Sequence, residues 1–160
     1  FKIDPNNEAI QFIINEVQWS YLILFFILFF LGGYLLYSGL MAAVGAAVDE
    51  EADTQQFLLP LTIPMVFAIL MASKVIDEPS SSLAFWLSEI PFTSPIIMIV
   101  RIAMGIGDSS VEIWEIILSL FLLTITFIGT TWISGRIYKK GILAYGKKAS
   151  YSDLFKWLKN

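Results

Sequence analysis

The sequence has neither cysteine nor histidine among its 160 residues. Their absence excludes disulfides, thiolate chemistry, imidazole bases and the usual transition-metal ligands. Charged residues are scarce as well, at 15%, whereas hydrophobic residues make up 57%. This composition is far from that of a soluble domain. We therefore expect an all-α membrane protein, because helices satisfy their own backbone hydrogen bonds in lipid.

Long runs without a charged residue locate the segments that can cross a bilayer, because a charge at its centre costs about 2.5 to 3.5 kcal/mol. The sequence has three such runs of 20 residues or more, and one crossing needs about 20 residues. We predict three transmembrane helices at about residues 20–48, 57–76 and 114–136. The first run is long enough to tilt or to protrude from the membrane.

Between the second and third predicted spans, residues 83–106 are apolar but interrupted. Pro91 and Pro95 each remove a backbone donor and disfavour a helical conformation of the preceding residue. The uncharged stretch around them is too short to cross. We expect two short helices around a kink, forming a re-entrant segment covered by other helices, since broken backbone at membrane depth needs cover. A surface amphipathic helix is the alternative.

Basic residues gather at one end of the sequence, where seven of the ten Lys and Arg lie between Arg136 and Lys159. By the positive-inside rule this end is cytoplasmic. The chain is then a multi-pass protein of the cell inner (plasma) membrane. Its N-terminal residues lie outside, Asp49–Gln56 inside and Asp77–Trp114 outside.

Arg101 and Lys74 are then the basic residues near the outer side. Each could simply extend its charged end to the interface. Alternatively, Arg101 pairs with Glu89, Glu112 or Glu115 and fixes the re-entrant segment, because a charge within the membrane usually has a partner. The sequence leaves both possibilities open.

The two terminal segments have amphipathic character. Residues 1–19 carry apolar side chains at helical spacing and predict an external amphipathic helix. Residues 137–160 predict a basic cytoplasmic tail whose last part is an amphipathic helix on the inner leaflet. No signal-peptide pattern opens the sequence at Phe1, and we expect the chain to be part of a longer protein.

Two patterns within the predicted spans concern helix packing and shape. Gly39, Ala43 and Ala47 recur every four residues, and such a face of small residues lets another helix approach, within the chain or from a second copy. Pro60 and Pro64 lie one turn apart, so the second span should bend or unwind. The bend could serve a moving part or a pathway, or it could be a static kink.

The turn between the first two spans is strongly acidic. It contains Asp49, Glu50, Glu51 and Asp53, and such a cluster is a solvated face or a protein contact. No catalytic constellation is visible. The stretch Gly141–Lys148 fits the spacing of a phosphate-binding loop but has Lys where Ser or Thr is needed, so we reject a nucleotide site there.

The order of these features resembles the C-terminal half of ABC type-2 permeases, especially the branch similar to the sodium-exporting NatB permeases. The resemblance covers roughly residues 34–160. It is carried by the stretches Tyr37–Val48, Asp49–Gln56, Leu59–Pro64, Ile90–Pro95 with Arg101 downstream, and Gly135–Lys148.

The resemblance implies a permease with six spans, of which this chain supplies the last three. The chain would form part of the translocation pathway of an ATP-driven exporter, without a nucleotide site of its own. A separate ABC ATPase would contact the turn that holds Asp49, Glu50, Glu51, Asp53 and Gln55. A second permease copy, identical or different, would complete the transporter. Neither a cofactor nor nucleic acid is expected, and the substrate is not fixed.

A membrane protein without a transport role is the main alternative, as a scaffold or a signalling anchor whose spans merely assemble. A membrane-embedded enzyme is a third possibility. The lack of His, of Cys and of a buried carboxylate pair leaves such an enzyme little chemistry.

Overall fold

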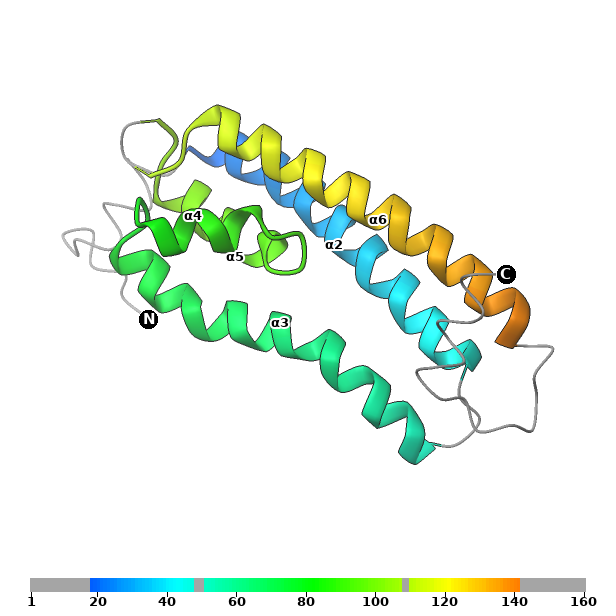
Figure 1. Ribbon diagram of the computed structural model, residues 1–160. Helices are drawn as coiled ribbons and strands as arrows, with labels where there is room; N and C mark the ends of the chain where they lie inside the picture. The colour runs from blue at the N-terminus through cyan, green and yellow to red at the C-terminus, as the bar shows by residue number, and fades with distance from the viewer. Residues whose placement is uncertain (1–17, 48–50, 108–109, 142–160) are drawn as a thin grey trace, which may run out of the picture.

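The computed structural model describes residues 18–47, 51–107 and 110–141. They form five helices, drawn in Figure 1: α2 (Trp19–Ala47), α3 (Glu51–Asp77), α4 (Ser82–Glu89), α5 (Ser94–Met104) and α6 (Ile113–Gly141). No strand occurs in these ranges, which hold a single isolated bridge between Ile106 and Val111. The predicted all-α membrane fold is confirmed.

Three of the helices are long and apolar enough to cross a membrane, over Trp19–Ala46, Thr54–Asp77 and Ile113–Lys139. Their number and order are those predicted. Two boundaries differ, because the sequence placed residues 51–56 in a turn and residues 137–141 in a tail, whereas both stretches are helical. Charged residues can lie in a helix where it extends beyond the hydrocarbon core of the bilayer. They mark where the membrane-spanning part ends, but the helix itself can continue.

The predicted terminal helices lie mainly in residues 1–17 and 142–160, outside the described part of the chain. The rejected phosphate-loop stretch lies almost wholly there too.

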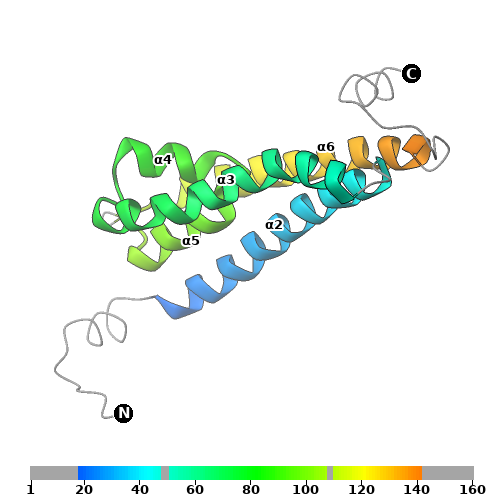
Figure 2. The ribbon, with the colours of Figure 1, turned by 90° about the horizontal axis from the view of Figure 1, so that it is seen from below.

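The long helices are arranged as a pair and a single helix. α2 and α6 pack along each other, and both views show them side by side (Figures 1 and 2). α3 joins them mainly through α5. The short helices α4 and α5 therefore fill the space between α3 and the α2–α6 pair at one end of the molecule.

Two apolar clusters hold these elements together, and α5 belongs to both. One joins α2, α5 and α6 through Phe29, Leu36, Met98, Ile102, Val111, Ile116 and Leu123. The other joins α3, α4 and α5 through Ala68, Val75, Ala84, Leu87 and Ile97. Ile97 and Met98 are adjacent in α5 and belong to different clusters. α5 therefore connects α3 to the α2–α6 pair.

Outside these clusters the long helices expose large apolar side chains in every direction. Leu70, Ile63 and Tyr34 are each more than 60% exposed. Such a surface suits acyl chains as solvent. Since lipid supplies no hydrophobic force between helices, close packing has to hold them together.

Small residues mark the tightest of these helix contacts. A Cβ added at Gly33 would lie 2.8 Å from Cγ of Pro95, and one at Gly32 would lie 2.7 Å from Cδ2 of Leu123. Gly39, from the predicted small face, lies less tightly against Thr131 of α6, with Ala43 of the same face buried. The sequence pattern thus pointed to a looser contact and missed the two tightest.

We predict that Gly33→Ala destabilises the fold. The Pro95 ring cannot rotate away, so α2 and α5 must separate, at a cost of about 1 to 3 kcal/mol for overpacking. The thermal unfolding midpoint of the protein in detergent should fall. Gly32→Ala should cost less, because the leucine can change rotamer, and Gly129→Ala, with nothing within 4 Å, should cost nothing. Equal midpoints for the Gly33 and Gly129 variants would contradict the contact.

Candidate functional site

The two short helices are set up by local sequence signals. Ser81 caps α4 by accepting a hydrogen bond from the Ala84 amide on its hydroxyl. α4 ends at Glu89, two residues before Pro91. In the turn, the Thr93 hydroxyl donates to the Leu87 carbonyl. We call residues 82–104, with this turn, the α4–α5 hairpin.

The two prolines act differently from the prediction that both break the helix. The break falls at Pro91, but Pro95 lies in the first turn of α5, and Ser94 before it is already helical. A helix leaves its first amides without partners, so a proline there costs no hydrogen bond. The expected pair of short helices is present. With 8 and 11 residues, neither reaches the length of a crossing.

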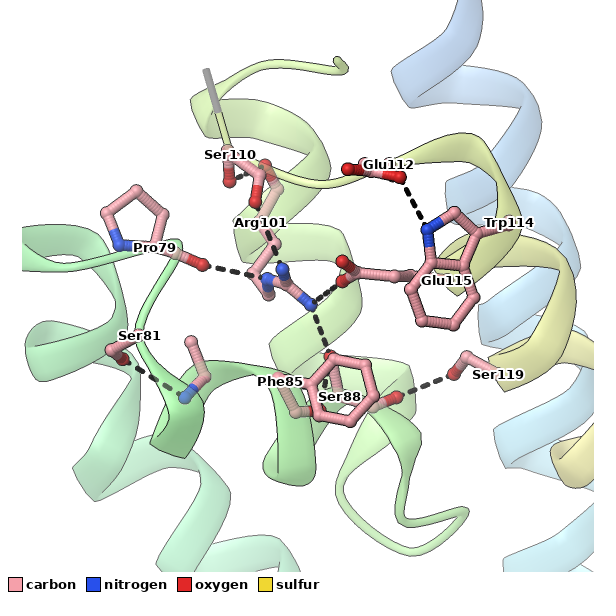
Figure 3. A network of polar contacts seen from close by, with 11 residues as sticks. Pro79, Ser81, Phe85, Ser88, Arg101, Ser110, Glu112, Trp114, Glu115 and Ser119 are labelled. Atoms are coloured by element: carbon pink, nitrogen blue, oxygen red, sulfur yellow. Dashed lines mark hydrogen bonds and ion pairs between the residues drawn. The ribbon is translucent and has the colours of Figure 1, made fainter. Parts of the chain in front are cut away.

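Arg101 is the centre of a polar network at this end of the molecule (Figure 3). Only 2% of the residue is exposed. Its Nε donates to the Pro79 carbonyl at 2.9 Å, Nη1 to the Ser88 hydroxyl at 2.7 Å, and Nη2 to the Ser110 carbonyl at 3.0 Å. Nη1 also lies 2.6 Å from Oε2 of Glu115. Each guanidinium nitrogen therefore has a partner.

These contacts fasten the hairpin to α6 and to both flanking loops. Ser110 also donates its hydroxyl to the Arg101 carbonyl, and the Ser119 hydroxyl of α6 donates to the Ser88 carbonyl at 2.6 Å. Removing either Arg101 or Glu115 would leave the other as an uncompensated buried charge. The network thus fixes the position of α4 and α5 against the third long helix.

The partner of Arg101 is one of the three acids that the sequence allowed. It is Glu115, whereas Glu112 accepts a hydrogen bond from the Trp114 indole. Lys74 stays exposed at the end of α3. Sequence reasoning missed Ser88, Ser110 and Ser119, because a serine that binds a carbonyl or a guanidinium leaves no periodic signal.

Glu89 lies beside this network but takes no part in its hydrogen bonds. It is 5% exposed, and neither carboxylate oxygen has a hydrogen-bond partner among the described residues. Burial raises its pKa most, the Glu115 carboxylate raises it too, and the Arg101 guanidinium lowers it, for a net pKa of about 7. At the end of α4, the ionised form of the Glu89 carboxyl is therefore less stable than it would be in water.

Two of the cavities beside the hairpin differ sharply in chemistry. The polar one, of about 460 Å³, borders the network and is lined by Ser80, Ser81, Ser82, Phe85, Arg101, Gly107, Ser110, Glu112 and Glu115. The apolar one, of about 390 Å³, lies between α2, α3 and the turn at Phe92, where the Tyr37 hydroxyl donates to the Phe92 carbonyl. The described residues contain no group of three acidic side chains able to hold a metal ion.

The remaining predicted site residues lie elsewhere. Asp49 and Glu50 are outside the described residues, while Glu51, Asp53 and Gln55 belong to the first turns of α3. The structure does not bring Glu51, Asp53 or Gln55 to the hairpin, because these three residues lie at the opposite end of α3 (Figure 1). Pro60 and Pro64 lie inside α3, which continues as a helix through both. Of the two expected outcomes, bending or unwinding, the unwinding does not occur, and the bend stays a prediction.

Comparison with known proteins gives one family and two curated relatives. Residues 9–136 match the family described as ABC-2 family transporter protein. The chain is 30% identical over 132 residues to the uncharacterized protein YhaP of Bacillus subtilis, covering 82% of this chain and 30% of YhaP. It is 25% identical over 136 residues to the uncharacterized protein MJ1024 of Methanocaldococcus jannaschii, covering 85% of this chain and 33% of MJ1024.

The chain spans about a third of the length of these relatives. No solved structure matches it. The family match covers α2 to α5 and most of α6, and it includes the whole Arg101 network. This multi-pass chain therefore belongs to the ABC-2 transporter family, whose members are the membrane permease components of ABC transporters.

Proposed function

We propose that the chain is the C-terminal half of an ABC permease that works in ATP-driven export, in the branch similar to the NatB permeases. The observation that carries this proposal is the family match across all three helices of crossing length. The relatives, about three times as long, leave room for a further membrane half. The resemblance adds a second permease copy, identical or different, and two ATPases. A scaffold or anchor without transport is not favoured by membership of a transporter family.

We infer that the C-terminus is cytoplasmic and that the protein lies in the plasma membrane. The arrangement supports this orientation, because the start of α3 and the end of α6 lie at the same end of the molecule, away from the hairpin (Figure 1). Arg136 and Lys139 belong to that end of α6, and the Arg136 guanidinium lies 4.0 Å from the Trp132 ring centre. A basic, aromatic helix end is typical of the cytoplasmic interface.

Cysteine labelling tests this topology, since the chain has no cysteine of its own. Cysteines at Ser80 and Glu112, both exposed, should react with a membrane-impermeant maleimide in intact cells. A cysteine at Ser150 should react only after permeabilisation. Ser110 is unsuitable, because it is buried and hydrogen-bonded to Arg101. Labelling of positions 80 and 112 from opposite sides would show that the hairpin crosses the membrane.

We propose that the acidic residues Asp49, Glu50, Glu51 and Asp53, with Gln55, contact the ATPase. Four carboxylates so close together repel one another unless water or a basic partner surface meets them. Glu51 begins α3, and the far half of α3 packs on α5 through Ala68 and Val75. A push at this end of the helix would therefore reach the hairpin.

Replacing Glu50 and Glu51 together by Lys should reduce co-purification of the ATPase, or keep the complex and lower transport-stimulated ATP hydrolysis. The matched control replaces Asp77 and Glu78 by Lys, which makes the same charge change at the opposite end of α3, where both residues are exposed. The control should leave assembly and hydrolysis unchanged. Wild-type assembly, hydrolysis and transport in the first variant would rule out a coupling role.

We propose that the α4–α5 hairpin is a re-entrant segment held at membrane depth by Arg101. Two short helices joined by a turn expose backbone groups that lipid cannot satisfy. Here the turn after Pro91 packs on α2, with the Tyr37 hydroxyl donating to the Phe92 carbonyl and Gly33 facing Pro95. The buried ion pair between Arg101 and Glu115 links this segment to α6, one of the helices of crossing length.

Arg101→Gln should destabilise the protein by about 3 to 5 kcal/mol, because it leaves Glu115 buried without its cation. The double variant with Glu115→Gln should recover part of this loss, since no charge is then buried. Lys74→Gln, which removes an exposed cation from α3, is the matched control and should be neutral. The measurements are thermal unfolding in detergent and yield in the membrane. Additive losses in the double variant would contradict a direct pair.

A further inference from the structure

Among the described residues, the Glu89 carboxylate has no hydrogen-bond partner, although it lies beside the Arg101 network, whose members have several. It is 5% exposed, and both carboxylate oxygens are buried without a donor among the described residues. Ser88, the residue before it, donates its hydroxyl to the Phe85 carbonyl, accepts from Arg101, and has its carbonyl bound by Ser119. The hydroxyls of Ser88 and Ser119 and the Arg101 guanidinium are thus already engaged, and neither carboxylate oxygen of Glu89 accepts from them. An ionised Glu89 would be unsatisfied. Such a group normally takes up a proton instead.

The described charges around Glu89 do not offer it a free cation. α5 contributes Arg101 and α6 contributes Glu115, and these two form an ion pair with each other. The charged residues at the end of α3, Lys74 and Asp77, are exposed, and α4 carries no charged residue besides Glu89. Of the three neighbouring groups, Arg101 and Glu115 neutralise each other. The Glu89 carboxyl is therefore left without a counter-charge.

A metal cation suits this position poorly. Hard cations such as Ca²⁺ and Mg²⁺ need about six oxygen ligands, whereas the described residues offer no group of three acidic side chains. The Arg101 guanidinium would also repel a cation beside it. A proton needs one oxygen atom and brings no coordination shell.

We propose that Glu89 is a proton-binding site, whose carboxyl holds a proton while α4 is packed against α5 and α6. When the hairpin moves and water reaches Glu89, the O–H proton passes to water and leaves the carboxylate. Packing of the hairpin and protonation of Glu89 are then linked, because the packed arrangement favours the neutral form.

The direction of the pKa shift of Glu89 agrees with a carboxyl group that is protonated when packed. The pKa of Glu89 is raised from 4.5 to about 7. Between pH 4.5 and about 7, the packed hairpin therefore binds more protons than a hairpin whose Glu89 is exposed to water. Its stability is therefore complete at low pH and is lost as the pH rises from 4.5 to about 7. A proton released near neutral pH could report the state of the hairpin to the rest of the transporter.

Infrared difference spectroscopy tests the site in the full-length permease, reconstituted in lipid nanodiscs and titrated with acid and base. The carbonyl band of a protonated carboxylic acid should disappear with a midpoint near 7 rather than 4.5. Glu89→Gln, a neutral side chain of the same shape, should fold, lack this band, and have a thermal unfolding midpoint that varies less with pH. Glu78→Gln is the matched control, since Glu78 is exposed near the same end, and it should keep the band.

Three results would overturn the proposal. The first is a band that titrates unchanged in the Glu89→Gln variant, and the second is a midpoint at the ordinary pKa of glutamate. The third is loss of the wild-type band at constant pH on addition of sodium ions, which would make Glu89 a ligand of a metal cation instead. None of these readouts depends on transport, so the proposal can fail while the permease function stands.

Discussion

A guanidinium buried inside a membrane protein has to be neutralised and hydrogen-bonded at the same time, and the position of the α4–α5 hairpin follows from how Arg101 meets both demands. The Glu115 carboxylate supplies the charge, and two loop carbonyls with the Ser88 hydroxyl complete the set. These partners come from both flanking loops, from α4 and from α6. Because losing one partner leaves the others with an uncompensated charge, the whole end of the molecule is held as a unit.

The remaining helices are held to this end of the molecule by the packing of apolar side chains. α5 carries Ile97 into one apolar cluster and Met98 into the other, so it joins α3 to the α2–α6 pair. Contacts at glycine bring the backbones close, as where Gly33 meets Pro95. Exposed apolar side chains on the long helices suit lipid, and lipid gives no hydrophobic reward for the association of helices. The packing of small and rigid side chains therefore decides which helices stay together and leaves α3 the least tightly held of the long ones.

The two ends of the molecule differ in chemistry, and α3 connects them. One end carries the acidic start of α3 and the basic end of α6, a mixture suited to meeting a charged protein partner in water. The other holds the Arg101 network, a polar cavity and the unpartnered Glu89 carboxyl. α3 reaches from the first end into the cluster around Ile97. Under the proposed function, α3 would transmit the effect of ATP hydrolysis from the first end of the molecule to the hairpin at the second.

The sequence by itself determined the helical class, the number and order of the crossing helices, and the break at Pro91. These features follow from composition, from charge spacing and from the missing proline amide, all of which act locally along the chain. It offered three acids as possible partners of Arg101, beside the alternative that the side chain extends to the interface, without choosing Glu115. It also treated Pro95 like Pro91, although Pro95 begins a helix and Pro91 follows the end of one. Only the tertiary structure decided these points, together with the burial of Glu89, the three serines of the network and the contact of Gly33 with Pro95. Each depends on which side chains from distant parts of the chain meet in space, and that proximity leaves no periodic trace in the order of residues.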